Sequence, residues 1–246
     1  MPSTPPPPFT ALLLGLTGCL VDFGARTLPL ALQRTVARHT DGQLDEVAPL
    51  APTDQLEALL KRRPRPAERA RLQDALVEAA HERAEPAPGL DALLDRLASQ
   101  NIPAAWLEEL PEHVTTVLAQ SLPESLPPAQ AGTGRPWPAP DSCWNALAGL
   151  GVERLEGCVL VSGEPRLLQA GLNAGLWTVG LAASGRLCGH ALGDWQALPA
   201  NERDARRARA TLELYRLGAH SVIDHLGELP DCLDDLASRR QKGEKP

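Results

Sequence analysis

Five short, mostly apolar runs, separated by segments with helical spacing, constrain the fold of this chain more than any other feature. They lie at residues 9–16, 102–107, 157–161, 176–181 and 221–223. Nearly continuous apolar runs are typical of strands buried on both faces of a parallel sheet. Helical spacing between them, at 90–99, 142–150, 165–173 and 201–216, supplies crossover helices. The sequence therefore predicts an α/β fold with helices on both faces of a parallel sheet.

One long segment, 26–84, carries many charges and helical apolar spacing. A Pro-Ala-Pro-Gly sequence follows at 86–89 and predicts a turn or loop at the end of this segment. We expect a helical cap at 26–84, inserted into a core made of 9–25 and 85–246. The proline-rich start, 1–8, is expected to be a disordered tail, with a ligand for a proline-recognition domain as the alternative. A frayed, charged end is expected at 238–246.

Composition limits the classes of partner and compartment. Lys and Arg number 24 against 31 Asp and Glu, a net charge of -7 that argues against nonspecific nucleic-acid binding. Five scattered cysteines without a Cys-x-x-Cys predict neither a disulfide framework nor a zinc site, and fit a reducing, cytoplasmic setting. The first apolar stretch is broken by Gly15, Gly18 and Asp22, so we expect neither a secretory signal nor a membrane span.

Several segments together resemble one family of hydrolases. They are LLLGLTGCLVDFG at 12–24, GRP at 134–136, QAGLNAGLWTVG at 169–180, and GAHSVID at 218–224 followed by Leu229-Pro230. The chain resembles the haloacid dehalogenase-like hydrolases, and more narrowly the phosphonoacetaldehyde hydrolases, or phosphonatases. The resemblance covers nearly the whole chain. It implies a Rossmann-like core with a helical cap inserted after the first strand.

The resemblance also implies hydrolysis of the carbon–phosphorus bond of phosphonoacetaldehyde. In that family a cap lysine forms a Schiff base with the aldehyde, and an Asp at the end of the first strand attacks phosphorus. Mg²⁺, held by carboxylates, balances the charge of the transferred phosphoryl group. This chain departs from the family pattern at Gly15, Pro52, Trp106, Gly163 and Leu167.

The acidic positions of the family are the first departure. Gly15 stands where the resemblance places the nucleophilic Asp, and it has no side chain that could form an acyl phosphate. Gly163 and Leu167 stand where it places two metal-side Asp residues, and Mg²⁺ depends on oxygen ligands. Glu164 either substitutes as a ligand or is solvated. We therefore expect no metal and no cofactor, although the family implies Mg²⁺.

The second departure from the family pattern concerns the hydroxyl that binds the phosphate and the Schiff-base lysine. The family's Ser or Thr falls near 105–107, so the indole of Trp106 would take the phosphate's place, either as a stacking platform or as a core side chain. Pro52 stands where the Schiff-base lysine is expected. The chain has three lysines, and two of them, Lys242 and Lys245, lie in the charged tail. The third, Lys61, opens a charged run typical of a solvated helix face.

Arg135 is the main family residue that survives. Its guanidinium either binds an anion, with Thr17, Gly18 and Cys19 as further candidates in the first loop, or lies at the surface or pairs with Glu164. Cys19 is either a thiolate nucleophile or a buried apolar filler.

Two further residues of the family signature are expected to act structurally. Asp22 is expected to fix the geometry of the first loop or cap junction, and His220 to make a structural hydrogen bond.

Three functional hypotheses follow from these departures. The first is a phosphonatase-like protein that has lost nucleophile, metal ligands and lysine, and works by binding, regulation or assembly. The second is a hydrolase with altered, metal-independent chemistry that uses Arg135 with Glu164 or Cys19. The third is a sensor of an unidentified small anion, held by a pocket of positive potential around Arg135.

The expected partner is a second protein chain. The apolar cap positions would suit a homodimer, or a heterodimer with an active relative, formed through the cap. These positions are Leu28, Leu30, Leu32, Leu56 and Leu60.

Overall fold

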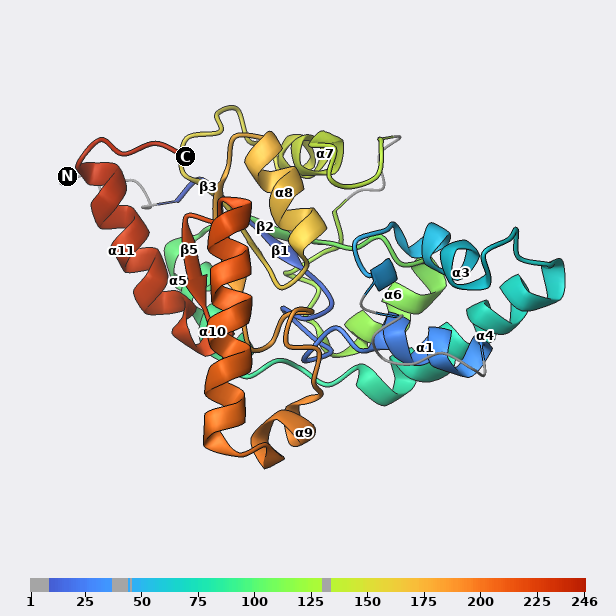
Figure 1. Ribbon diagram of the computed structural model, residues 1–246. Helices are drawn as coiled ribbons and strands as arrows, with labels where there is room; N and C mark the ends of the chain where they lie inside the picture. Colours follow the sequence, from blue (N-terminus) through green and yellow to red (C-terminus); the bar gives the residue numbers. More distant parts are fainter. Residues whose placement is uncertain (1–8, 37–43, 45, 130–133) are drawn as a thin grey trace.

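The computed structural model, in which residues 9–36, 44, 46–129 and 134–246 are described, is built on a five-stranded parallel sheet (Figure 1). The strand order is β2-β1-β3-β4-β5. The strands are β1 (Ala11–Gly15), β2 (Ala104–Leu107), β3 (Cys158–Ser162), β4 (Trp177–Leu181) and β5 (Ser221–Ile223). Each overlaps one of the five predicted runs, so the predicted α/β architecture is confirmed. The predicted tail at 1–8 lies outside the described residues.

Helices cover both faces of this sheet because successive strand residues point to opposite sides. Leu12 and Leu14 of β1 pack in a cluster with α5 (Leu90–Gln100), α6 (Glu112–Leu118) and α11 (Leu229–Gln241). Leu13 packs on the other side with α7 (Asp141–Gly149) and α8 (Pro165–Asn173). Next to α8, α10 (Ala200–Leu217) covers β4 and β5, and the short α9 (Leu192–Ala197) precedes it.

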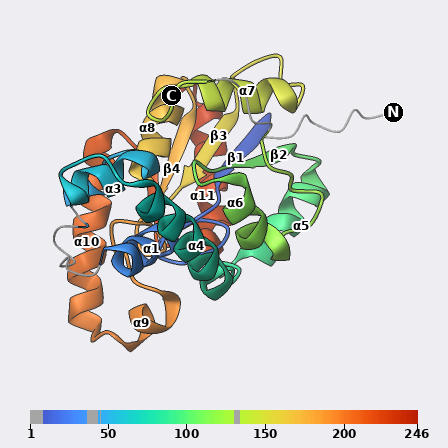
Figure 2. The ribbon, with the colours of Figure 1, turned by 90° about the vertical axis from the view of Figure 1, so that its right-hand side faces the viewer.

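Three helices of the predicted cap segment lie beside this core (Figures 1 and 2). They are α1 (Thr27–Thr35), α3 (Pro52–Leu60) and α4 (Pro66–Arg83). Helix α1 packs along α4, and α4 in turn contacts α6 of the core. Among the described residues, no helix is both long and apolar enough to cross a membrane.

The apolar cap residues expected at a dimer interface face the interior instead. Leu28, Leu32 and Leu56 are buried, and Leu30 and Leu60 are partly buried against the same hydrophobic cluster. These leucines stabilise the cap and its contact with the core, because one apolar stripe per helix is needed for that packing. Leu28, Leu32 and Leu56 therefore supply no exposed surface to a partner, and dimerisation through the cap stays a prediction.

The junction between core and cap is a crossing of two backbone segments. The N–H of Asp22 donates to the carbonyl of Glu85, and the N–H of Ala87 donates to the carbonyl of Leu20. The Asp22 carboxylate accepts the N–H groups of Arg26 and Thr27, both at 2.9 Å, and so satisfies free donors at the start of α1. The expected structural role of Asp22 is confirmed.

The chain ends differently from the frayed tail expected at 238–246. Helix α11 continues to Gln241, and its Arg239 donates to the carbonyl of His220 at 2.9 Å. The same guanidinium lies over the Trp177 ring, 5.0 Å from its centre. His220 Nδ1 accepts the N–H of Thr178 at 3.1 Å, which confirms its structural hydrogen bond. The prediction was wrong for 238–241 because these tertiary contacts stabilise a highly charged helix.

Candidate functional site

The candidate site is a small cavity where the carboxyl ends of the parallel strands meet the cap. Ligand sites of open α/β sheets lie at this edge. The cavity has a volume of about 30 Å³, room for only a water molecule or two. It is lined by Thr17, Asp22, Ala25, Leu28, Pro52, Glu108, Glu109, Leu110, Trp137, Glu164, Arg166 and Arg186.

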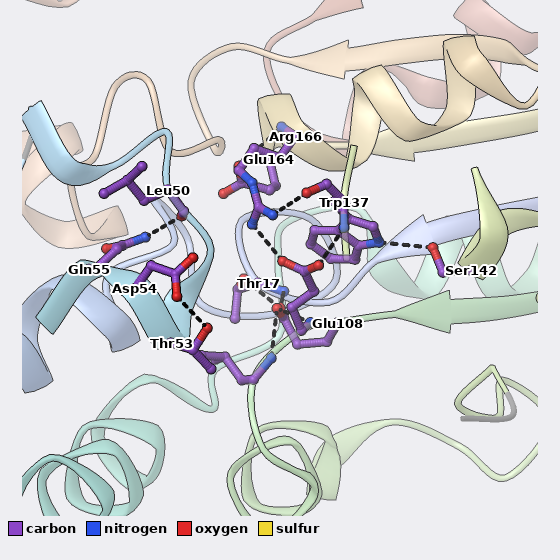
Figure 3. Close-up of polar contacts among 12 residues, drawn as sticks. Thr17, Leu50, Thr53, Asp54, Gln55, Glu108, Trp137, Ser142, Glu164 and Arg166 are labelled. Carbon is purple, nitrogen blue, oxygen red and sulfur yellow. Dashed lines mark hydrogen bonds and ion pairs between the residues drawn. The ribbon is translucent and has the colours of Figure 1, made fainter. Parts of the chain in front are cut away.

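Glu108, the first residue after β2, turns its carboxylate onto the loop that follows β1. Thr17 donates to Oε2 twice, from its hydroxyl at 2.7 Å and from its N–H at 3.2 Å (Figure 3). Oε1 accepts the N–H of Glu109 at 2.8 Å. Burial raises the pKa of Glu108, and these hydrogen bonds oppose that shift. The Glu108 carboxylate therefore accepts the hydrogen bonds of the donors beside Gly15.

Glu109 forms a part-buried ion pair with Arg166 of α8. Arg166 Nη1 donates to Glu109 Oε2 at 2.5 Å, and Arg166 also donates to the carbonyl of Trp137. The N–H of Trp137 donates to Glu109 Oε1 at 2.6 Å. This triangle joins β2, α8 and the loop before α7, and it satisfies both charges.

Glu164, at the start of α8, pairs with the second inward-facing arginine. Its Oε1 accepts the N–H of Arg166 and so caps α8, while its Oε2 accepts Arg186 Nη1 at 3.2 Å. The side chains of Glu164 and Arg186 are each 14% exposed. Glu164 is therefore a helix cap and an ion-pair partner, not a solvated carboxylate.

The position aligned with the nucleophile is enclosed by the core. A Cβ on Gly15 would lie 2.8 Å from Ser162 Oγ and 3.5 Å from Leu167 Cδ2. Leu167 is fully buried with the apolar side chains of α7 and α8. The structure thus brings Gly15 and Leu167 together, as the resemblance implies, but in an apolar contact.

Gly163 leaves no space for a side chain at all. A Cβ there would lie 2.5 Å from the carbonyl oxygen of Gly18 and 2.5 Å from Gly185 Cα. Real Cβ atoms do not approach other atoms this closely, so the loops after β1 and β4 would have to move before an Asp could be accommodated.

Magnesium does not fit the donor set around this cavity. A Mg²⁺ ion needs oxygen ligands in near-octahedral array. The carboxylates of Glu108, Glu109 and Glu164 already accept hydrogen bonds or ion pairs from the protein's own donors. Across the described parts of the chain, no group of three or more His, Cys, Asp or Glu side chains is placed to hold a metal ion.

Trp106 does not take the phosphate's place. It pairs with Leu14 in the sheet register and packs with Leu14 in the cluster on the α5 and α6 side. The alternative of a core tryptophan is therefore correct, and Trp137 is the indole that lines the cavity. Trp137 Nε1 donates to Ser142 Oγ at 2.9 Å (Figure 3).

Arg135 and Cys19 do not form an anion site with the cavity. Arg135 has a side chain 72% exposed and pairs with Asp141 at 3.0 Å, so its surface alternative is correct. Cys19 is fully buried, and burial strongly raises the pKa of its thiol, which makes it a filler. Gly18 supplies its carbonyl to Ser184 Oγ, while Thr17 and Pro52 do line the cavity. Lys61 is exposed at the end of α3.

Several cavity residues were missed from the sequence. They are Glu108, Glu109, Trp137, Arg166 and Arg186. One signal was present: Glu108 and Glu109 directly follow a predicted strand, as Thr17 does, and Glu164 follows β3 after Gly163. Such positions converge at one edge of a parallel sheet. No comparable signal marks Trp137 or Arg186, which lie on long loops.

Comparison with known proteins finds relatives that are similar in sequence to part of this chain. No protein-family model matches the chain. A phosphonoacetaldehyde hydrolase of Klebsiella pneumoniae is 40% identical over 119 residues, 47% of this chain and 42% of that protein. One of Aeromonas hydrophila is 36% identical over 177 residues, 66% of this chain and 61% of that protein. The chain thus spans about half the length of the curated relatives it matches.

Solved structures extend the likeness over the whole fold. A phosphonoacetaldehyde hydrolase-like protein from Oleispira antarctica has a TM-score of 0.81 at 24% identity, covering 97% of this chain and 96% of its own. A family IA haloacid dehalogenase hydrolase of Entamoeba histolytica has a TM-score of 0.70 at 16% identity, covering 94% and 100%.

The parallel sheet with its inserted helices therefore has the fold of these haloacid dehalogenase-like hydrolases. Over the aligned segments, the chain is similar in sequence to the phosphonoacetaldehyde hydrolases.

Proposed function

We propose that this protein keeps the phosphonatase-like hydrolase scaffold without phosphoryl-transfer catalysis, and acts instead by binding, regulation or assembly. The observation that carries the proposal is the self-occupied cavity. The donors beside Gly15 are bound by Glu108, and Arg166 and Arg186 are bound by Glu109 and Glu164.

Steric packing supports the same proposal independently. Gly163 is too closely packed for a carboxylate without movement of two backbone loops, and a side chain at Gly15 would require the Ser162 hydroxyl to turn away. A nucleophile, its metal and an imine lysine must all be present for the family reaction. No single substitution restores that set.

Turnover tests the proposal. Purified protein, incubated with phosphonoacetaldehyde and Mg²⁺, is expected to release no acetaldehyde above the uncatalysed rate. The Aeromonas hydrolase serves as positive control under identical conditions. Release at a rate near that of the control would overturn the proposal.

A metal-independent hydrolase is the second candidate. It is favoured by one observation, the contact of 2.7 Å between the Thr17 hydroxyl and the buried Glu108 carboxylate, whose pKa is raised by burial. A carboxylate beside a hydroxyl has the geometry of a general base. This candidate predicts turnover of a small ester or phosphonate that survives EDTA and is abolished by Glu108→Gln.

Assembly as a homodimer or mixed dimer is part of the first proposal. It needs a surface other than the five cap leucines, since these face the interior. Light scattering on the purified chain, alone and mixed with the Aeromonas hydrolase, measures both forms of assembly. A cytoplasmic location is part of the same proposal, supported by five cysteines that form no disulfide.

A further inference from the structure

One arginine bridges the core and the cap across the cavity. Arg186, in the loop between β4 and α9, donates from Nη1 to Glu164 Oε2 at 3.2 Å on the core side. From Nη2 it donates to Gln55 Oε1 at 3.3 Å on α3 of the cap. The guanidinium of Arg186 therefore bridges the core and the cap. The only covalent connection between these two parts is the pair of backbone segments that cross at their junction.

Both partners of this arginine are fixed in place. Gln55 is fully buried, and its amide nitrogen donates to the carbonyl of Leu50 at 2.9 Å (Figure 3). Glu164 is fixed by the N–H of Arg166, and the backbone N–H of Arg186 donates to the carbonyl of Gly163 at 3.0 Å. A planar guanidinium with preset partners loses little conformational freedom when it binds them.

The same loop ties down a second part of the cap. Arg26, immediately before α1, donates from Nη1 to the carbonyl of Gly189 at 2.9 Å. The loop from Ser184 to Gly189 thus contacts the start of α1 through Gly189 and α3 through Arg186. Pro52 lines the cavity from the same helix as Gln55, so α3 forms part of the cavity wall.

We propose that Arg186 is a latch that holds α3 against the core and keeps the cavity closed. The inference goes beyond the proposed function and holds whether or not the protein catalyses a reaction. Breaking the contact on the cap side, while keeping the Arg186–Glu164 pair, releases α3 and leaves the core intact. Hinge and lid motions of this kind are set by a few contacts at the moving interface.

Spin labels on the two sides of the cavity test the latch. Labels at Glu57→Cys on α3 and Asn145→Cys on α7 occupy exposed positions, and all five native cysteines are buried, so labelling is confined to the introduced thiols. Double electron–electron resonance should give one narrow distance distribution with Arg186 present. Gln55→Leu should move at least half of the population to longer distances.

Two more variants make the result decisive. Arg186→Ala should shift the distribution as Gln55→Leu does. The double variant should add little to either shift, because both substitutions remove the same contact between Arg186 and Gln55. Arg135→Ala, which breaks an exposed pair away from the cavity, is the matched control and should leave the distribution unchanged. An unchanged distribution in Gln55→Leu would overturn the proposal even if Arg186→Ala failed to fold.

Discussion

A side-chain carbon on Gly163 would lie 2.5 Å from the carbonyl oxygen of Gly18. This contact brings the turn after β3 against the loop after β1, the place where the related hydrolases are expected to hold a metal-binding carboxylate. The close approach requires glycine, because no side chain fits at position 163 without movement of the neighbouring loops.

Gly163→Ala should therefore destabilise the protein, because one methyl group must push two loops apart. Overpacking of this kind costs about 1–3 kcal/mol in the free energy of unfolding. Gly193→Ala, on α9, is the matched control, since nothing lies within 4 Å of its Cβ position. Urea unfolding of both variants compares them directly. Equal stability of the two variants would contradict the packing at Gly163.

The two arginines near the site should respond very differently to removal. Arg166→Ala leaves the Glu109 carboxylate, which is 15% exposed, without its cation, and should cost about 2–4 kcal/mol of unfolding free energy. Arg135→Ala removes only an exposed pair and should leave stability unchanged within error. A similar loss in both variants would show that Arg135 is not the surface residue described above.

Asp22 should make stability depend on pH. Burial raises its pKa to about 6, while in the unfolded chain it titrates near its ordinary value of about 3.9. The native state therefore binds more protons than the unfolded state between about pH 4 and 6, and the contribution of Asp22 to stability falls as pH rises through this window. The change is on the order of 2–3 kcal/mol.

The difference between wild type and Asp22→Asn isolates this term, because all other titrating groups cancel. Relative to the variant, the wild type should lose stability from pH 4.5 to 7, as measured by urea unfolding at each pH. Parallel profiles for the two proteins would mean that the carboxyl of Asp22 is not shifted.

The strands were predictable because their signal is local. A parallel strand buried on both faces is apolar throughout, and β5 and α8 begin and end where the sequence indicates. The extent of α11 was not predictable, since its last turn depends on Arg239 lying over Trp177, which is far away in sequence.

The site was predictable only where it follows strand ends. Position 15 and position 167 do meet, as the resemblance implies. The sequence left Trp106 open between a stacking platform and a core side chain, because a shift of one residue along β2 turns a side chain to the other face of the sheet. The side chain that reaches the edge of the sheet after β2 is that of Glu108. The sequence left Arg135 open between an anion site and the surface, because nothing local tells which arginine turns inward to a part-buried carboxylate, as Arg166 does to Glu109.

Titration calorimetry with Mg²⁺ tests the central claim most directly, because the family reaction depends on that ion and the cavity carboxylates are committed to the protein's own donors. The wild-type protein at neutral pH should give no binding heat at millimolar Mg²⁺, while the Aeromonas hydrolase measured alongside it should. Saturable binding of one Mg²⁺ per chain, lost in Glu108→Gln or Glu164→Gln, would contradict the account.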